Sequence, residues 1–292
     1  MLKNKAKDTF FSKNHSLNCR GRLLKLDTPR VMGILNITPD SFYDGGRYDE
    51  PAAAVTRAHE MISEGADIID LGAASSRPGA ELVPPELEIS RLEPVISAIR
   101  DEYPEIIISI DTYNASVAEK MINTFHADMI NDISAGNLDP EMIPLISRLN
   151  VPYIIMHMKG TPGDMQNNPV YENVTDEVIQ YFAERVYLLH DKGVSDVLID
   201  PGFGFGKTMD QNYELLAQAN TLQMFELPVV AGISRKSMIY NLLGSTREDA
   251  LNGTTAAHMI LLQKGVNIIR VHDVKEAREA VSIFNETRNR RD

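Results

Sequence analysis

Short apolar runs alternate along almost the whole chain with longer segments in which apolar residues recur at helical spacing. Eight of these runs predict β-strands: Val31–Leu35, Ile68–Leu71, Ile106–Ile110, Met129–Ile130, Tyr153–Met156, Val197–Ile199, Val229–Ala231 and Ile268–Val271. The clearest helical patterns are 174–189 and 251–262. Strands that alternate with helices pair in parallel through right-handed crossovers. Eight such units in about 250 residues favour a closed (β/α)8 barrel, the TIM barrel, over an open sheet.

Two local patterns refine this prediction. Ile89, Leu92, Ile96 and Ile99 fall at helical spacing, and Pro94 should kink that helix or mark its first turn. Before the first barrel strand, Arg20-Gly21 separates two short runs, which predicts a β-hairpin capping the barrel floor. Residues 1–15 are predicted to be disordered, and 16–292 to form one barrel domain, because no linker or composition break divides them.

The segment Asp200–Lys207 (DPGFGFGK) directly follows the sixth apolar run. A carboxylate at the carboxyl end of a parallel strand points into the crevice where such proteins bind ligands. We interpret the three glycines as allowing close approach to a flat ligand, with Phe203 and Phe205 stacking on it. A phosphate-binding P-loop is excluded because Pro201 stands where its first glycine would be, and the spacing differs from the dinucleotide motif.

All eight predicted strands end in polar side chains, which predicts a ligand-filled barrel mouth. Asp111, Asn131, Asp200 and Lys236 suit a planar heterocycle whose edge carries donors and acceptors. Asn36, Arg270 and His272 come from strands one and eight, which are neighbours only in a closed barrel. This group suits an anion, and the location is a common phosphate site.

Composition narrows the class of protein. The formal net charge of −12 argues against a nucleic-acid surface, which would need a basic patch. Cys19 is the single cysteine, so a reducing compartment is expected. The first residues lack the apolar core of a signal peptide, and no run of 18 apolar residues could span a membrane. We therefore expect a soluble, cytoplasmic protein.

Five ordered motifs resemble the dihydropteroate synthase family, the sulfonamide target of folate synthesis. They are Asn36–Phe42 (NITPDSF), Ser76–Gly79 (SRPG), Asp200–Lys207, Ser234–Ser237 (SRKS) and Arg270–His272 (RVH). The resemblance runs from about Leu17 to Ile283. It implies a transferase that condenses 6-hydroxymethyl-7,8-dihydropterin diphosphate with 4-aminobenzoate and releases pyrophosphate. It also implies Mg²⁺ as cofactor and a homodimer formed through late helices such as 251–262.

The resemblance assigns roles to individual residues. The pterin-pocket positions are Asp111, Asn131, Asp200 and Lys236. The diphosphate positions are Asn36, Ser76, Arg270 and His272, with Asn36 also at the metal. The aminobenzoate positions are Ser76, Arg77, Pro78, Phe205, Lys236 and Ser237. The residues expected to carry catalysis are Asn36, Arg77, Lys236, Arg270 and His272, and the loops after strands one and two match mobile segments that close over the substrates.

One segment departs from the family pattern. Gly72–Pro78 reads GAASSRP where the family usually has Gly-Gly-x-Ser-Thr-Arg-Pro, so Ser76 keeps a hydroxyl but loses a methyl group. Closure of this loop or its sulfonamide contacts are therefore expected to differ, while hydrogen bonding by the hydroxyl is kept.

Some alternatives stay open at this point. Asp70 and Asp132 suit helix caps as well as partners of the site residues, His157 suits a wall residue as well as a contact, and Arg235 suits a structural ion pair. Two other functions also fit part of the pattern. One is a methyltetrahydrofolate corrinoid methyltransferase, which would share Asp111, Asn131 and Asp200 but needs no diphosphate site. The other is a non-catalytic pterin-binding protein, which would require a broken mouth.

Overall fold

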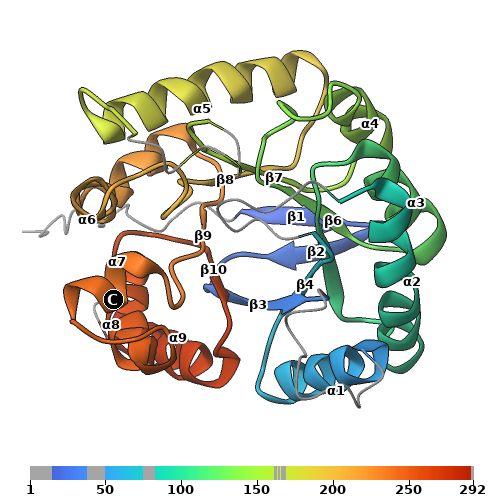
Figure 1. Cartoon of the computed structure of the whole chain (residues 1–292), viewed down its shortest axis with the longest axis horizontal. Coiled ribbons are helices and arrows are strands. Elements are labelled where there is room, and N and C mark those ends of the chain that lie inside the picture. The colour runs from blue at the N-terminus through green and yellow to red at the C-terminus, as the bar shows by residue number, and fades with distance from the viewer. Residues whose placement is uncertain are drawn as a thin grey trace, which may run out of the picture.

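Eight parallel strands form the centre of the molecule. The computed structural model describes residues 15–37, 50–74, 83–160, 163, 165 and 169–290. The strands follow the order β8-β7-β6-β5-β4-β3-β10-β9, and a parallel bridge between Ile199 and Val229 joins the two ends of this order. The barrel is therefore closed, and the predicted TIM barrel is confirmed (Figure 1). The strands are β3 (Arg30–Asn36), β4 (Ile68–Gly72), β5 (Ile107–Asp111), β6 (Met129–Asp132), β7 (Tyr153–Met156), β8 (Val197–Asp200), β9 (Val230–Ala231) and β10 (Ile268–Val271).

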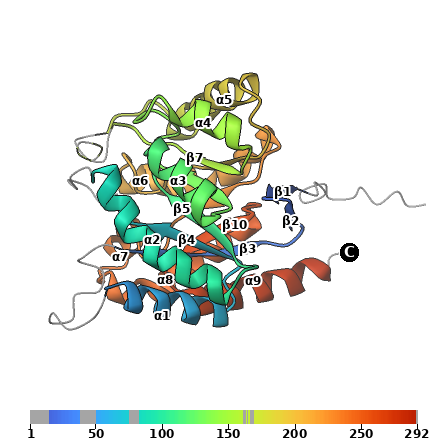
Figure 2. The ribbon, with the colours of Figure 1, turned by 90° about the vertical axis from the view of Figure 1, so that its right-hand side faces the viewer.

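Helices surround the strands on the outside of the barrel (Figures 1 and 2). They are α1 (Glu50–Ser63), α2 (Pro85–Glu102), α3 (Ala115–Phe125), α4 (Met142–Leu149), α5 (Val174–Asp191), α6 (Met209–Ala217), η3 (Ala219–Phe225), α7 (Ser237–Leu242), η4 (Glu248–Ala250), α8 (Leu251–Gln263) and α9 (Val274–Asn289). The two long helices predicted from periodicity are α5 and α8. Pro94 lies well inside α2, which begins at Pro85, so the suggestion that Pro94 marks a first turn was wrong. Within the part of the chain that the structure describes, no helix has both the length and the apolar character to cross a bilayer.

The strands are apolar on both faces because each face packs against a different partner. Val31, Ile69 and Ile130 point outward and belong to the core shared with the helices. Met32 and Ile68 point inward at the start of their strands and belong to a second, smaller core. Strands buried on both faces read as continuous apolar runs, which is why the runs were recognisable in the sequence.

The second core is completed by an N-terminal hairpin. β1 (Ser16–Cys19) pairs antiparallel with β2 (Arg22–Lys25). The hairpin contributes Leu17, Cys19 and Leu24 to the inward-facing apolar residues at the strand starts. Figure 2 shows it at one end of the barrel, so the predicted floor cap is confirmed.

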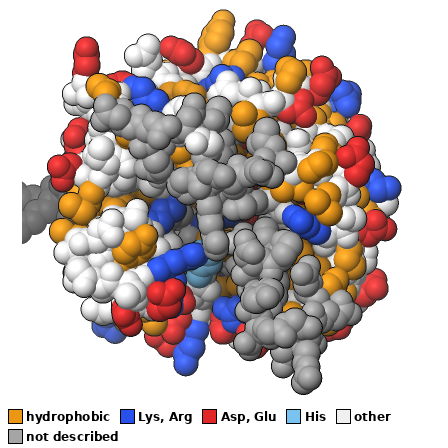
Figure 3. Space-filling view, in the orientation of Figure 1, with side chains coloured by type: hydrophobic (Ala, Val, Ile, Leu, Met, Phe, Trp, Pro, Cys, Tyr) orange, Lys and Arg blue, Asp and Glu red, His pale blue; other side chains and the backbone are white. Residues whose placement is uncertain are grey.

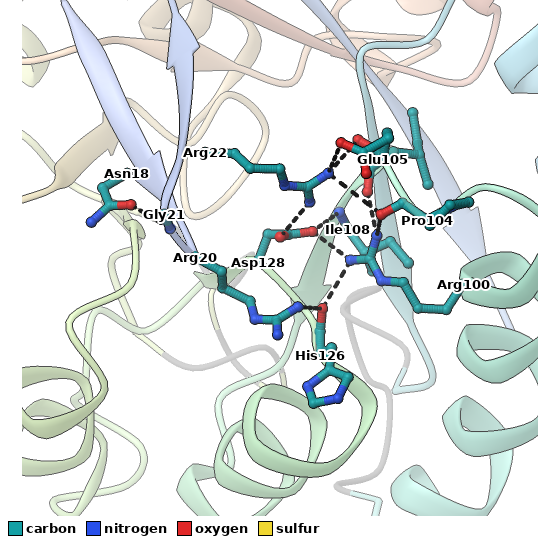
Figure 4. Close-up of polar contacts among 11 residues, drawn as sticks. Asn18, Arg20, Gly21, Arg22, Arg100, Pro104, Glu105, Ile108, His126 and Asp128 are labelled. Carbon is teal, nitrogen blue, oxygen red and sulfur yellow. Dashed lines mark hydrogen bonds and ion pairs between the residues drawn. The ribbon is translucent and has the colours of Figure 1, made fainter.

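A buried carboxylate ties the hairpin to the barrel (Figure 4). Asp128, which directly precedes β6, is fully buried and accepts from Arg22 Nη2 at 2.8 Å, from Arg100 Nη2, and from the backbone N–H of Ile108 at 2.9 Å. Arg20 donates to the carbonyl of His126 at 2.9 Å. Two guanidinium groups around one carboxylate compensate its desolvation, which an unpaired buried charge could not tolerate.

Candidate active site

The strand register brings polar side chains to one level at the carboxyl ends of β3 to β6. Asn36 is the partner of Gly72, Gly72 of Asp111, and Asp111 of Asn131. Because Gly72 has no side chain, Asn36 and Asp111 face each other across it. A Cβ at position 72 would lie 3.5 Å from Asn36 Oδ1 and 3.7 Å from Asp111 Oδ2.

Arg270, on β10, reaches across this level and joins the strands electrostatically. Its Nε donates to Asp70 Oδ2 and its Nη2 donates to Asp111 Oδ2, each at 2.6 Å. Asp70 Oδ2 also accepts from Asn131 Nδ2 at 3.0 Å. Asp70 is thus a partner of the site residues, which answers the question that the sequence left open. Arg270, from the predicted anion-binding group, therefore contacts Asp111 of the predicted heterocycle-binding group directly and Asn131 through Asp70, so the two groups form one connected site.

Asp200 ends β8 and lies near Lys236, which follows β9. The carboxylate accepts from the backbone N–H of Gly202 at 2.8 Å through Oδ1. Lys236 Nζ donates to the carbonyl of Phe203 and lies 4.4 Å from the centroid of the Phe205 ring. A cation over the face of an aromatic ring is attracted by the quadrupole of that ring.

Burial shifts the protonation of these groups. It raises the pKa of Asp200, and the Lys236 charge opposes that rise. It also raises the pKa of Asp111, with Arg270 acting in the opposite direction. Burial lowers the pKa of Lys236 to about 8, while the Asp200 carboxylate works against this shift. Such perturbed groups gathered in one cleft are typical of functional sites.

The glycines of the Asp200–Lys207 loop pack against protein, which corrects our interpretation of the motif. A Cβ on Gly202 would lie 2.0 Å from the carbonyl oxygen of His157, and one on Gly206 would lie 2.6 Å from that of Lys159. Gly204 faces the stem of Lys236, with its Cβ position 3.1 Å from Cδ. All three have positive φ angles. They therefore allow the loop to fit against the chain after β7 and against Lys236.

The two aromatic side chains of this loop differ. Phe203 is fully buried in the core between barrel and helices, so the predicted stacking of Phe203 on a ligand was wrong. Phe205 is partly buried and packs with a small apolar cluster that includes Tyr113 and Met156. Only Phe205 remains available to a ligand at the mouth.

His272 and Ser237 have different exposure. His272 is partly buried and its backbone N–H donates to Ser234 Oγ at 3.2 Å. Burial and the neighbouring Arg270 lower its pKa to about 4, so it is neutral at pH 7. Ser237 is exposed at the first position of α7.

Two other residues have structural partners. Arg235 forms a two-point ion pair with Asp273, at 2.8 and 2.9 Å, as the structural alternative predicted. Asp132 accepts from the hydroxyl of Tyr153 at 2.7 Å and from the backbone and side chain of Ser134, so it orders the turn after β6.

Sequence reasoning assigned no role to Lys207, although it is almost completely buried beside the site. Lys207 Nζ lies 3.0 Å from His157 Nδ1 and donates to two carbonyls of its own loop. Burial, aided by the Lys236 charge, lowers its pKa to about 7. In the sequence, the only sign of this role was a lysine at the end of the Asp200–Lys207 motif. The sequence does not show that the Lys207 side chain turns into the protein, because that direction depends on the conformation of the loop. His157 is therefore a wall residue bound to Lys207.

The predicted residues Ser76, Arg77 and Pro78 lie outside the described residues, as do Thr38–Phe42 of the first motif. In the space-filling view, Lys and Arg side chains and a histidine lie near the centre of the face that Figure 3 shows, with Asp and Glu side chains beside them. The acidic net charge of the chain therefore does not exclude local positive charge on this face.

Oxygen donors for a hard cation are present, but they are few. Asn36 Oδ1 faces the space above Gly72, and the nearby Asp111 Oδ2 is already paired with Arg270. Among the residues that the structure describes, no group of three His, Cys, Asp or Glu side chains could hold a metal ion. This donor set fits Mg²⁺, which keeps several waters and binds through one or two protein oxygens together with substrate phosphates.

The chain matches the family model of pterin binding enzymes over residues 32–272 and belongs to that family. Among its relatives is the dihydropteroate synthase of Escherichia coli K12, which is 42% identical over 93% of this chain and 96% of its own length. The Yersinia pestis dihydropteroate synthase, solved with a sulfonamide drug complex, has a TM-score of 0.89 and 39% identity over 94% of this chain and 100% of its own. The Xanthomonas albilineans dihydropteroate synthase with 4-aminobenzoic acid has a TM-score of 0.88 and 39% identity over 94% and 99%. Within the pterin-binding family, the chain thus groups with the dihydropteroate synthases.

Proposed function

We propose that the chain is a transferase of folate biosynthesis that condenses 6-hydroxymethyl-7,8-dihydropterin diphosphate with 4-aminobenzoate, giving 7,8-dihydropteroate and pyrophosphate. The observation that carries the proposal is one continuous polar network at the barrel mouth. It joins Asn131 through Asp70 and Arg270 to Asp111. The relatives named dihydropteroate synthase support the same reaction.

The pterin would lie between Asp111, Asn131, Asp200 and Lys236. A carboxylate at Asp200 accepts paired N–H bonds from the guanidine-like edge of the ring, and Lys236 donates to the ring carbonyl. The carboxylate already accepts from the Gly202 N–H, so its orientation is fixed before the ligand arrives. A carboxylate that already has the orientation needed for binding loses less conformational entropy when the ligand binds than a mobile one does.

The diphosphate would lie toward Asn36, Arg270 and His272. Nε and Nη2 of Arg270 are bound to carboxylates, which leaves Nη1 for an anion. His272 is neutral at pH 7 and would act as a hydrogen-bond donor. When bound beside Asn36, Mg²⁺ would stabilise negative charge on the departing pyrophosphate. This electrostatic stabilisation acts where negative charge develops in the transition state, and it would therefore raise the rate.

The attacking group needs little activation, because an arylamine is a neutral nucleophile at pH 7. The difficult step is loss of pyrophosphate from a methylene carbon, and the electron-rich dihydropterin can share the developing positive charge. A dissociative substitution follows from these two properties. Phe205, Lys236 and Ser237, with Ser76, Arg77 and Pro78, would frame the aminobenzoate.

Neither alternative function explains the mouth as well. A corrinoid methyltransferase that uses methyltetrahydrofolate would have no use for an anion site at Asn36, Arg270 and His272. A non-catalytic pterin-binding protein would not need to keep these residues. The relatives that match over nearly the whole chain carry the name of a synthase.

The assembly and location that we propose are a homodimer in the cytoplasm. Leu242 at the end of α7, Leu243 directly after it and Ile260 on α8 are large, exposed apolar side chains, and the two helices are neighbours. Contact between two copies of the chain would bury these apolar side chains. The single, buried cysteine fits a reducing compartment. Light scattering of the wild type and of Leu243→Asp would test the dimer, with a monomer expected only for the variant.

Pyrophosphate release tests the reaction directly. The purified chain is supplied with pterin diphosphate and Mg²⁺, with and without 4-aminobenzoate. We expect release that depends on the amine and matches the dihydropteroate formed. Release at the same rate without the amine would indicate a hydrolase, and no release with tight pterin binding would indicate a non-catalytic protein.

A further inference from the structure

The loop between Asp200 and Lys207 contacts two different lysines. Lys236 Nζ donates to the carbonyl of Phe203 and lies over the ring of Phe205. Lys207 Nζ donates to the carbonyl of Gly202 at 2.8 Å and to that of Phe205 at 3.0 Å. Both lysines therefore contact the same short segment of the loop.

The Lys207 Nζ has four acceptors within hydrogen-bond distance. Besides the two loop carbonyls, they are Nδ1 of His157 at 3.0 Å and the carbonyl of the same residue at 3.4 Å, on the chain that follows β7. Burial and the charges of Lys207 and Lys159 lower the pKa of His157, so its ring stays neutral and Nδ1 can accept. Lys207 is 3% exposed, so it cannot reach a ligand in the mouth. A lysine with all its donors used and no access to ligand has a positioning role.

Other contacts fix the loop at its remaining backbone groups. The hydroxyl of Tyr171 donates to the carbonyl of Gly206 at 2.7 Å. The side chain of Asn212 accepts from the N–H of Gly204 at 2.7 Å and donates to the carbonyl of Lys207. These bonds hold Gly204 and the end of the loop at Gly206 and Lys207, whereas the carbonyls of Gly202 and Phe205 are held by Lys207. Removing Lys207 would release these two carbonyls, which flank the Phe203 carbonyl and the Phe205 ring.

We propose that Lys207 is a positioning residue for the synthase reaction, acting through the 202–206 loop on Lys236 and Phe205. The inference rests on the proposed function and deepens it, because it identifies what fixes the lysine that contacts the substrates. Asp111 and Asn131 sit on strands and do not depend on the loop. Loss of Lys207 therefore affects the part of the site formed by Lys236 and Phe205.

Lys207→Met tests this proposal, because methionine keeps much of the apolar stem and removes all three donors. Lys264→Met is the matched control. Lys264 follows α8, is partly buried, and its Nζ donates to Asn220 Oδ1 at 3.2 Å, not to the loop. We expect Lys207→Met to raise the KM for 4-aminobenzoate at least tenfold with a smaller change in kcat, and Lys264→Met to change either less than threefold.

A double-mutant cycle separates positioning from general damage. Because Lys207 acts on Lys236 and Phe205 together, adding Lys207→Met to the double variant Lys236→Ala/Phe205→Ala should lower kcat/KM less than threefold further. Full additivity of the losses would overturn the proposal. So would a Lys207→Met enzyme whose kcat falls with its folded fraction at unchanged KM. Wild-type turnover in the same assay reports the proposed function separately.

Tyr171→Phe provides a second variant if Lys207→Met does not fold. It removes only the hydroxyl that holds Gly206, and the ring stays partly buried. The expected result is a rise in the KM for 4-aminobenzoate of twofold to fivefold at unchanged kcat. An unchanged KM for this folded variant would overturn the claim that the loop's position controls the site.

Discussion

Gly202→Ala probes the fit of the DPGFGFGK loop, and Gly193→Ala is its matched control. Both glycines have positive φ angles, +69° at Gly202 and +80° at Gly193. An added Cβ would lie 2.0 Å from the His157 carbonyl oxygen at position 202, but would have no neighbour within 4 Å at position 193. The left-handed conformation costs a residue with a Cβ about 1–2 kcal/mol. Overpacking against fixed backbone adds about 1–3 kcal/mol or more.

We therefore expect the free energy of unfolding to fall by about 1–2 kcal/mol in Gly193→Ala and by about 2–5 kcal/mol in Gly202→Ala. Urea denaturation followed by circular dichroism measures both values. Turnover should fall only in Gly202→Ala, because the carbonyl of Phe203 and the ring of Phe205 must move with the loop. Equal destabilisation of the two variants, with equal turnover, would show that the loop does not pack against His157.

Three further predictions concern the substrate groups. Asp200→Asn should weaken binding of a pterin at least a hundredfold, since breaking a buried charged contact costs about 3–5 kcal/mol, and unchanged affinity by calorimetry would reject the assignment. Arg270→Ala should weaken binding of the pterin diphosphate more than that of a diphosphate-free pterin, which also loses the support of Arg270 for Asp111, and equal weakening of both would make Arg270 a pterin or folding residue. Pterin affinity should fall as pH rises through about 8, where Lys236 loses its proton, and a flat profile from pH 7 to 9.5 would contradict this role. Because its folded-state pKa lies below 10.5, Lys236 also makes folding stability rise with pH between about 8 and 10.5.

The strands and the hairpin were predictable because their cause is local. Runs such as Tyr153–Met156 are apolar throughout, since both faces of a barrel strand are buried, and polar residues mark their ends. The hairpin followed from the turn at Arg20 and Gly21, both of which adopt positive φ angles. The sequence predicted that Pro94 would either kink this helix or mark its first turn, and the structure places it inside α2.

The contacts within the site were less predictable, because they depend on side-chain direction in loops. Strand order could bring Arg270 close to Asn36, but its pairing with Asp70 and Asp111 depends on how far a long side chain reaches across the barrel. Phe203 and Phe205 are two residues apart in the same motif. One is in the core and the other is near the mouth, because the intervening glycine has a positive φ angle that no spacing rule reveals.

The hairpin at the barrel floor also constrains the order in which the chain can fold. Its apolar side chains Leu17 and Leu24 pack on inward residues that extend from Met32 to Ile268. The backbone N–H of Asn18 is bound to Asp196, 178 residues later in the chain. During synthesis, the hairpin therefore leaves the ribosome before the barrel strands but gains its complete docking surface only when β10 has emerged. Contacts of such sequence separation form slowly, and the apolar face of the hairpin stays exposed until then.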